Sequence, residues 1–523
     1  MKSGLLVLLL SLAAGVYAEY SANTKATPTN LELGRQLYLE GMLPSGKTIS
    51  GRVRGDIELS GKQVICGTCH RKSGMGSSEG DQVIPALAGS MLFKPLRLPT
   101  SSNPLAPTQR PAYTDETLKR AIRDGIDSNG LPLDPLMPRY PLSDHELDLV
   151  IGYLKSLSVE WSPGVDDKEI HFATIVAGDV SAADRKALKD VMRVYVEQKN
   201  SESRHETYRA ENAPWHKKWL FEPYRKWVMH VWELQGDSAS WGEQLKAHYA
   251  EQPVFAVLSG IGEGSWKPVH DFCQAQQVPC LFPTTSLPVI QEDDFYPIYL
   301  SKGMALEGEL VNLHLQSGQS TAPLIQVYRQ GNLKAETAAN GLIGARGEKA
   351  VNTLVWKKES SSPSAQFWES LLQKQVDTRL VVWMESEQLI NLWPVLEKSQ
   401  AWSRVYLSSS LFGTDGHSIP PPLRNRVFLT RTQELPSRTA RLLLRSTGWL
   451  KAKKIYAPEA LDVQANAYLA LKVAGDALTH IRGFFFRDYL IERIEHTVDN
   501  VPYTSVYPRI SMAPEQRFAA KGG

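Results

Sequence analysis

Two cysteines and a histidine near residue 70 have the spacing of a covalent cofactor site. Cys66 and Cys69 flank a Gly-Thr pair, and His70 follows directly. Two thiols at this spacing can form thioethers with the two vinyl groups of one haem, and the next imidazole then coordinates the iron. A zinc site would need two further ligands, and a dithiol redox motif would need a βαβ setting rather than the Gly-rich hairpin expected here. The motif therefore predicts one covalent haem c.

The sixth iron ligand should come from a loop downstream of the motif. Met137, in Leu-Met-Pro-Arg-Tyr, lies between two expected helices, and a thioether favours ferrous iron and raises the reduction potential. The ordinary alternative for a methionine is to fill a gap in a core. Met75, Met91 and His145 are the competing ligands. With both axial positions filled by the protein, no site remains for a substrate, so we expect an electron carrier and no catalytic residues.

The other two cysteines form a second pair. Cys273 and Cys280 are placed at the end of an expected helix and the start of the next strand. Exported proteins normally commit their thiols to disulfides or cofactors, so a disulfide is preferred over two free thiols.

The first residues and the composition indicate an exported soluble protein of several domains. Residues 1–18 have a positive start, an apolar run and a small-x-small cleavage site, which together predict a secretory signal peptide and a periplasmic location. No later segment has about 20 uninterrupted apolar residues, so no membrane span is expected. A formal net charge of +2 over 523 residues gives no electrostatic argument for nucleic acid. The length exceeds one ordinary core.

The N-terminal part has helix signals around the CxxCH motif. Residues 19–30 form a polar lead-in, residues 31–41 a helix, and the glycines from Gly46 to Gly61 an inserted hairpin. Residues 114–125 are expected to be helical. Ser143 and Glu146 form a capping box that opens a final helix through Leu157.

Residues 31–158 resemble a class I, mitochondrial-type cytochrome c domain. The resemblance rests on Gly34 and Tyr38, on CxxCH, and on Pro85-Ala-Leu-Ala-Gly, Met137-Pro and the closing helix that contains Tyr153. It implies an all-α domain in which the first and last helices cross at Gly34 and Tyr153. It also implies that the Pro85 carbonyl accepts a hydrogen bond from the second ring nitrogen of His70 and thereby orients it. The insertion between Tyr38 and Cys66 is long for this family.

After a linker at residues 159–165, residues 166–523 alternate between strand and helix patterns. This rhythm predicts parallel sheets with helices on both faces, in two α/β lobes. The expected strands are 170–177, 253–261, 278–283, 323–328, 380–383 and 405–409, and the expected helices are 181–199, 266–276, 299–315 and 463–482.

The order of the elements and the sequence of several segments in this half resemble the type I periplasmic solute-binding proteins, the receptors for branched-chain amino acids or amides. The segments on which the resemblance rests are Ile-His-Phe-Ala-Thr-Ile-Val-Ala at 170–177, Pro-Val-Phe-Ala-Val-Leu-Ser at 253–259, Val-Pro-Cys-Leu-Phe-Pro-Thr-Thr-Ser at 278–286, and the closing segment at 516–522. The resemblance implies that hydroxyls beyond the strand ends bind a small-molecule ligand, with capping or loop tightening as the alternative role. The candidates are Ser259, Ser265, Thr284 and Thr285. The usual aspartate is missing after Tyr328, and the chain ends slightly early for this family, which suggests a truncated C-terminus.

The segment 215–241 fits neither resemblance. It contains Trp215, Trp219, Trp227, Trp232 and Trp241 with basic residues between them. Trp215 with Trp219, and Trp227 with Val231, stand at helical spacing, which favours packing over a docking surface for a partner.

The fold class expected is therefore a multidomain protein, an all-α cytochrome c domain followed by a two-lobed α/β receptor-like domain. The function expected is single-electron transfer with a periplasmic dehydrogenase or oxidase, with a small-molecule receptor attached. Two alternatives remain: a non-catalytic subunit or docking platform of a dehydrogenase complex, and a haem-containing solute or redox sensor. Hydrolase and P-loop motifs are not found in the sequence.

Overall fold

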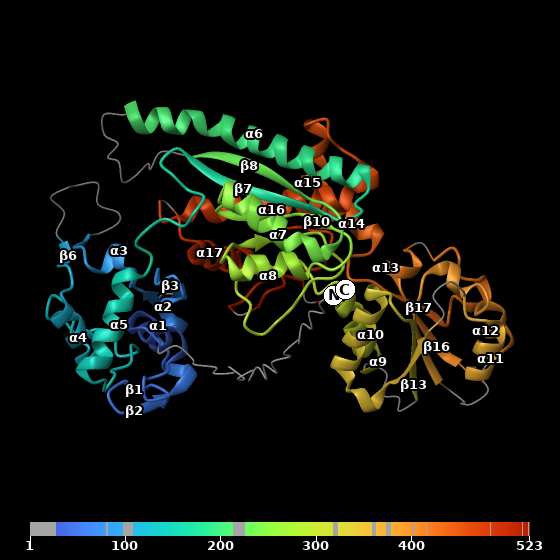
Figure 1. The fold of residues 1–523 in the computed structure, drawn as a ribbon, viewed down its shortest axis with the longest axis horizontal. Coiled ribbons are helices and arrows are strands. Elements are labelled where there is room, and N and C mark those ends of the chain that lie inside the picture. Colours follow the sequence, from blue (N-terminus) through green and yellow to red (C-terminus); the bar gives the residue numbers. More distant parts are fainter. Residues whose placement is uncertain are drawn as a thin grey trace, which may run out of the picture. The chain divides into compact units, whose positions relative to one another are not determined.

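The computed structural model describes most of the chain outside its N-terminus (Figure 1). The described ranges are 28–79, 82–97, 108–212, 225–316, 323–357, 362–372, 378–399, 402–414, 416–481, 483–514, 516–520 and 522–523. The predicted signal peptide, residues 19–27 of the lead-in, Trp215 and Trp219 lie outside them. Contacts divide the chain into two compact units: residues 1–69, 91–96 and 108–156, and residues 70–90, 97–107 and 157–523. The expected block 31–158 is therefore shared between them.

The first unit is built on helices. They are α1 (Asn30–Glu40), α4 (Asp115–Asp124) and α5 (Asp144–Ser156), with α2 (Cys66–His70) at the boundary of the unit. The capping box at α5 is present, because Ser143 donates from its N–H to Glu146 Oε2 at 2.8 Å and its Oγ accepts the N–H of Glu146. α1 crosses α5, with the rings of Tyr38 and Tyr153 at a centroid distance of 5.4 Å.

The expectation of an all-α N-terminal domain is not met, because short antiparallel strands interrupt the helices. β1 (Ser50–Val53) pairs with β2 (Ile57–Ser60), which is the inserted Gly-rich hairpin. β3 (Ser77–Glu79) pairs with β4 (Gln82–Ile84) in the second unit. A further pair joins β5 (Leu96–Arg97) and β6 (Thr108–Arg110), near the short helix α3 (Gly89–Leu92). The described part of this region is mixed α/β.

The rest of the second unit contains two α/β lobes, as the strand and helix patterns predict. The first sheet has the order β10-β7-β9-β11-β12, with β8 paired to β7, and these strands pair in parallel. Its strands are β7 (Glu169–Ala177), β8 (Lys226–Leu234), β9 (Ala256–Leu258), β10 (Ile261–Gly262), β11 (Cys280–Leu281) and β12 (Pro297–Ile298). Alternate residues of β7 face two separate cores, so helices cover both faces of this sheet.

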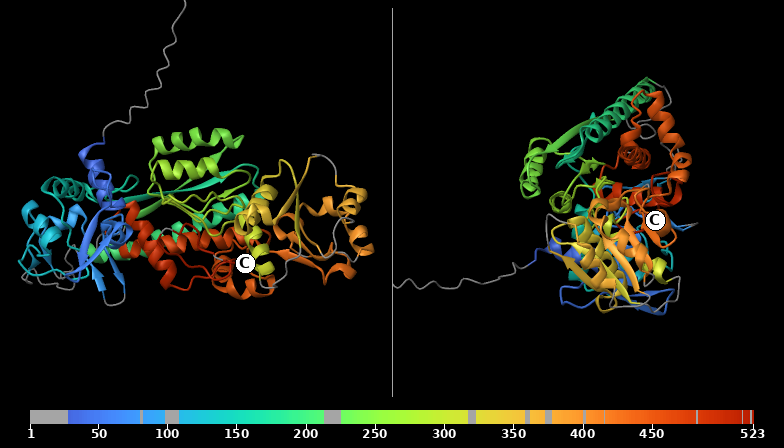
Figure 2. Two further views of the ribbon diagram at one scale, coloured as in Figure 1. Left: turned by 90° about the horizontal axis from the view of Figure 1, so that it is seen from below. Right: turned by 90° about the vertical axis from the view of Figure 1, so that its right-hand side faces the viewer.

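One face of the first sheet packs on helices from both ends of residues 166–523. These are α6 (Ala182–Asn212), α15 (Leu444–Ala452), α16 (Leu461–Ile481) and α17 (Arg487–Asn500). The other face packs on α7 (Trp241–Glu251) and α8 (Lys267–Ala275). In Figure 2 these two green helices lie on the opposite side of the sheet from the red helices.

The second lobe has a five-stranded parallel sheet in the order β14-β13-β15-β16-β17. Its strands are β13 (Leu324–Arg329), β14 (Asn352–Trp356), β15 (Thr378–Trp383), β16 (Trp402–Ser408) and β17 (Val427–Thr430). Helices α9 (Met304–Gln316) and α10 (Leu333–Arg346) cover one face, and α11 (Ala365–Leu372) and α12 (Trp393–Lys398) cover the other. The short helices α13 (Ser409–Phe412) and α14 (Pro436–Leu442) follow β16 and β17.

The helical reading of Trp227 and Val231 is wrong, because both residues lie on strand β8. Trp227, Trp232 and Trp241 are all at most 3% exposed, so these three pack in cores. The disulfide between Cys273 and Cys280 is present and joins α8 to β11. Within the described ranges, no helix has both the length and the apolar character needed to cross a membrane.

Candidate functional site

The CxxCH motif forms the short helix α2. Cys66 and Cys69 are three positions apart on this helix, so their side chains leave it on the same side. Neither is in a disulfide, and Cys66 is half-buried while Cys69 is exposed. Two reduced thiols on one side of a helix fit the attachment of a planar group through two thioethers.

Burial raises the pKa of the Cys66 thiol to about 11. Tyr140, which packs beside it and donates its hydroxyl proton to the carbonyl of Val64 at 2.8 Å, lowers that pKa by a smaller amount. Cysteines that act as redox nucleophiles have a depressed pKa, since the thiolate is the reactive form. Cys66 has the opposite shift.

His70 is only 7% exposed, and its ring is fixed by a backbone contact. Its Nδ1 lies 2.9 Å from the carbonyl oxygen of Pro85, which the resemblance to cytochromes c names as its acceptor. Burial lowers the pKa of His70, so the neutral imidazole is favoured. A neutral ring that donates Nδ1–H to a carbonyl leaves the lone pair of Nε2 for a metal.

Gly76 allows the Pro85 segment to approach His70. It has φ +76°, and a Cβ at this position would lie 2.2 Å from the carbonyl oxygen of Ile84. Its N–H donates to the carbonyl of His70 at 3.1 Å. A side chain here would push away strand β4, which Pro85 directly follows. Gly76 was not among the site residues expected from the sequence, although a glycine shortly after the motif is a usable signal.

Met137 belongs to the first unit, in the connection between α4 and α5. It is half-buried, and its N–H donates to the carbonyl of Asp134 at 3.0 Å in a turn. The competing methionines, Met75 and Met91, are also half-buried, whereas His145 is exposed at the start of α5. Among the residues described, no group of three or more His, Cys, Asp and Glu side chains is arranged to hold a bare metal ion.

Three of the four hydroxyls expected to bind a solute accept a local hydrogen bond. Thr284 Oγ1 accepts from Asn466 Nδ2 at 3.3 Å, Thr285 Oγ1 from the N–H of Leu287 at 3.2 Å, and Ser265 Oγ from the N–H of Lys267 at 3.4 Å. These are the local roles that compete with ligand binding.

Ser259 differs from the other three. It is 1% exposed, has φ +57°, and its Oγ is buried without a hydrogen-bond partner among the described residues. A positive φ is uncommon for a non-glycine residue, and Ser259 adopts it directly after the end of β9.

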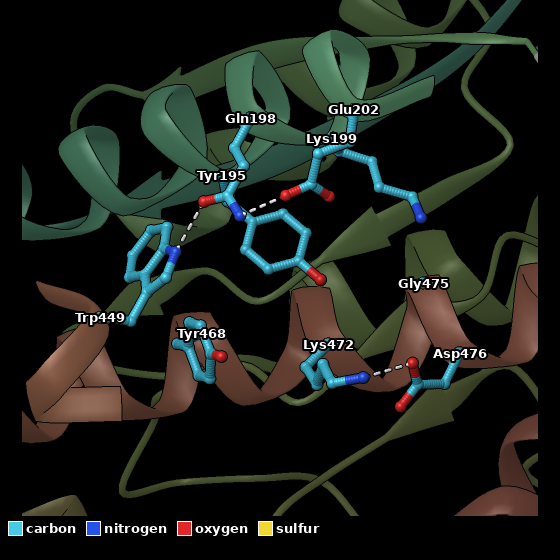
Figure 3. Close-up of a pocket in the computed structure, with 9 residues that line it drawn as sticks. All are labelled: Tyr195, Gln198, Lys199, Glu202, Trp449, Tyr468, Lys472, Gly475 and Asp476. Atoms are coloured by element: carbon cyan, nitrogen blue, oxygen red, sulfur yellow. Dashed lines mark hydrogen bonds and ion pairs between the residues drawn. The ribbon is translucent and has the colours of Figure 1, made fainter. Parts of the chain in front are cut away.

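A cavity of about 230 Å³ lies between α6 and helices α15 and α16, away from these loops (Figure 3). Tyr195, Trp449 and Tyr468 form its aromatic part, with ring centroids 5.1 to 6.0 Å apart. The indole N–H of Trp449 donates to Gln198 at 2.8 Å. The remaining lining residues are Lys199, Glu202, Lys472, Gly475 and Asp476. Two lysines and two carboxylates balance, so the net charge of the lining selects neither anions nor cations.

No protein-family model matches the chain, and no curated protein matches it. Several solved structures are similar over about two thirds of its length. A branched-chain amino acid ABC transporter protein from Rhodospirillum rubrum is 15% identical, with 68% of this chain and 95% of that chain covered and a TM-score of 0.48. A leucine-binding protein from Thermotoga maritima is 12% identical, with 67% and 93% covered and a TM-score of 0.45. A branched-chain amino acid ABC transporter protein from Thermus thermophilus with bound valine is 10% identical, with 68% and 92% covered and a TM-score of 0.44. At these TM-scores the likeness assigns neither a family nor a function to this chain.

Proposed function

We propose that this chain is an exported c-type cytochrome that transfers single electrons in the periplasm. Cys66 and Cys69 would hold one haem c through thioethers, and His70 and Met137 would be its axial ligands. The observation that carries the proposal is the 2.9 Å contact between His70 Nδ1 and the Pro85 carbonyl oxygen. His70 follows directly after Cys69 in the sequence, and both Cys66 and Cys69 are reduced. A haem bound there supplies a one-electron couple between ferric and ferrous iron.

The residues around the motif support this role in three ways. The Pro85 carbonyl fixes the tautomer and the orientation of His70, which leaves Nε2 as the coordinating nitrogen. The half-buried Met137 offers a thioether, a soft ligand that favours the ferrous state. The raised pKa of Cys66 argues against a dithiol redox role, since that chemistry needs a thiolate near neutral pH.

The receptor-like part of the second unit has two candidate roles. In the first, it binds a small molecule beyond the strand ends of its sheets, near Ser259. In the second, it binds no solute and supports the cytochrome within a larger oxidoreductase. Thr284, Thr285 and Ser265 accept local hydrogen bonds through their hydroxyl oxygens, so the O–H of each can still donate to a ligand. A thermal-shift titration with leucine, valine and a medium-chain fatty acid separates the two roles, since a ligand that binds only the folded state raises its melting temperature.

The haem proposal is tested by optical spectroscopy of the full chain matured with a c-type haem attachment system. We expect a c-type spectrum whose pigment stays with the protein in acidified organic solvent, because thioethers do not release haem. A colourless protein, or one that loses its pigment in that solvent, would overturn the proposal.

The sixth ligand is tested by Met137→Ala, with Met75→Ala as the matched control. Loss of a thioether ligand lowers the reduction potential and changes the oxidised spectrum. We expect both changes in Met137→Ala and neither in Met75→Ala. The reverse pattern would move the ligand to Met75.

A further inference from the structure

The residues directly after His70 are held by a helix from the far end of the chain. Ser73 is fully buried, and its N–H donates to Glu492 Oε1 at 2.8 Å. Its hydroxyl donates to the other carboxyl oxygen, Oε2. Glu492 lies on α17 and is 6% exposed. Both oxygens of this buried carboxyl group therefore accept hydrogen bonds from Ser73, which lies three positions after the expected iron ligand His70.

A second contact holds the same segment. The guanidinium of Arg71 donates to Glu495, one helical turn after Glu492, and Arg517 donates to the same carboxylate from the C-terminal segment. Glu495 and Arg517 are both buried. All these residues belong to the second unit, so α17 and the residues after His70 form one packed structure.

Hydrogen bonds connect Ser73 to the surroundings of His70. Its Oγ accepts the N–H of Met75 at 3.0 Å, and its carbonyl accepts the hydroxyl of Ser158 at 2.7 Å. One residue after Met75, the N–H of Gly76 donates to the carbonyl of His70. The imidazole of His70 in turn contacts the carbonyl of Pro85 through Nδ1. Hydrogen bonds therefore link Ser73, and through it Glu492, to the segment that holds the ring of His70.

On the premise that haem is bound at His70 as proposed above, we propose that Glu492 is a positioning residue that tunes the reduction potential of the haem and couples electron uptake to proton uptake. Electron uptake by the iron, from a one-electron donor, would be accompanied by binding of one proton from water to the Glu492 carboxylate. The added negative charge is then offset by one positive charge. A carboxylate stabilises ferric iron, and its neutral acid does not, so the potential falls when Glu492 loses its proton.

The surroundings of Glu492 place its titration in an accessible range. Burial raises its pKa to about 8, against the hydrogen bonds from Ser73 and the charge of Arg71, both of which lower it. Asp488 on the same helix raises it further. The other charges facing this region are Lys72 and the Arg517–Glu495 pair. The carboxyl group is therefore poised to change its charge in mildly alkaline solution.

The test is the midpoint potential of the full haem-loaded chain, measured by optical redox titration across about pH 6 to 10. We expect the wild-type potential to fall with pH around pH 8, and the potential of Glu492→Gln to be independent of pH there. Asp499→Asn is the matched control, because it removes an exposed carboxylate from the same helix and should keep the wild-type slope. Equal slopes in wild type and Glu492→Gln would overturn the inference.

A second variant keeps the inference testable if Glu492→Gln does not fold. Ser73→Ala removes the hydroxyl that stabilises the ionised carboxylate, so the fall in potential should move to higher pH. An unmoved profile in a folded, haem-loaded Ser73→Ala protein would contradict the role of Glu492. A protein without covalent haem would instead overturn the proposed function, so the two failures are distinguishable.

Discussion

Gly34 lies against the backbone of Leu149 where α1 crosses α5. A Cβ on Gly34 would lie 2.2 Å from the Leu149 carbonyl oxygen and 2.9 Å from Cβ of Tyr153. The helices can therefore approach this closely only because residue 34 has no side chain. This close approach is what positions Tyr38 against Tyr153.

Gly34→Ala should therefore destabilise the protein, although alanine is the better helix former. Intrinsic propensity alone would add about 1 kcal/mol of stability. The clash is with backbone, so the helices must separate, and we expect a net loss of about 1 to 3 kcal/mol in urea unfolding. Gly152→Ala on α5 is the control, because a Cβ there meets nothing within 4 Å. It should be neutral or stabilising, and equal effects of the two changes would contradict this account of the crossing.

Glu492 should make the folded state less stable as pH rises. Its folded pKa of about 8 lies above the ordinary value of about 4.5 in the unfolded chain. Between these values the unfolded state has released a proton that the folded state keeps, so stability falls by at most about 1.4 kcal/mol per pH unit. The contribution of Glu492 is fully present below about pH 4.5 and is lost as pH rises through about 8.

Glu492→Gln should remove this contribution. All other carboxyl groups are the same in both proteins. The difference in unfolding free energy between variant and wild type therefore reports the contribution of Glu492 alone. We expect the variant to gain stability relative to wild type from pH 5 to 8, measured by urea unfolding. A difference that does not change with pH would show that Glu492 ionises normally in the folded chain.

The local parts of this fold could be predicted from the sequence because they depend on neighbours in the chain. The capping box of Ser143 and Glu146, the hairpin of β1 and β2, and the alternation of strands and helices after residue 166 all follow from short-range patterns. The contact of His70 with Pro85 was expected from a family resemblance to cytochromes c.

Other parts carry no local signal. Trp227 and Val231 stand four positions apart, which is helical spacing, but they lie on strand β8. Buried and exposed residues do not alternate regularly along this strand. Without a regular inside-outside alternation, periodicity could not separate strand from helix. The pairing of Ser73 with Glu492 spans most of the chain, and neither residue belongs to a recognisable motif. Only the three-dimensional packing brings them together.

Arg487 should be among the residues on which the second unit depends most. It is 6% exposed, and its guanidinium donates to the carbonyl oxygens of Val254, Phe255, Gln276, Gln277 and Pro163 and to the hydroxyl of Tyr249. A lysine has three donors on one atom and cannot reach acceptors spread over several segments. Arg487→Lys should therefore lower the unfolding free energy by about 3 kcal/mol or more, because several buried carbonyls lose their partner.

Arg438→Lys is the control for that measurement, because Arg438 is exposed on α14 and forms a surface ion pair with Glu434. Surface pairs of this kind contribute at most about 1 kcal/mol. If Arg487→Lys were as mild as Arg438→Lys, water would have to satisfy the buried carbonyls instead.

The disulfide should stabilise the first lobe without affecting the proposed haem site. Cys273 and Cys280 are both buried, and the bridge closes a short loop of sequence separation 7. By the chain-entropy relation, a loop of this size contributes about 2.5 kcal/mol. The double variant Cys273→Ala/Cys280→Ala should lose about that amount in urea unfolding while keeping the wild-type optical spectrum, since the proposed thioethers use Cys66 and Cys69. An altered haem spectrum would show that the bridge also supports the haem segment, through the backbone hydrogen bond from Cys280 to Tyr296, whose hydroxyl lies 3.3 Å from Lys72 Nζ.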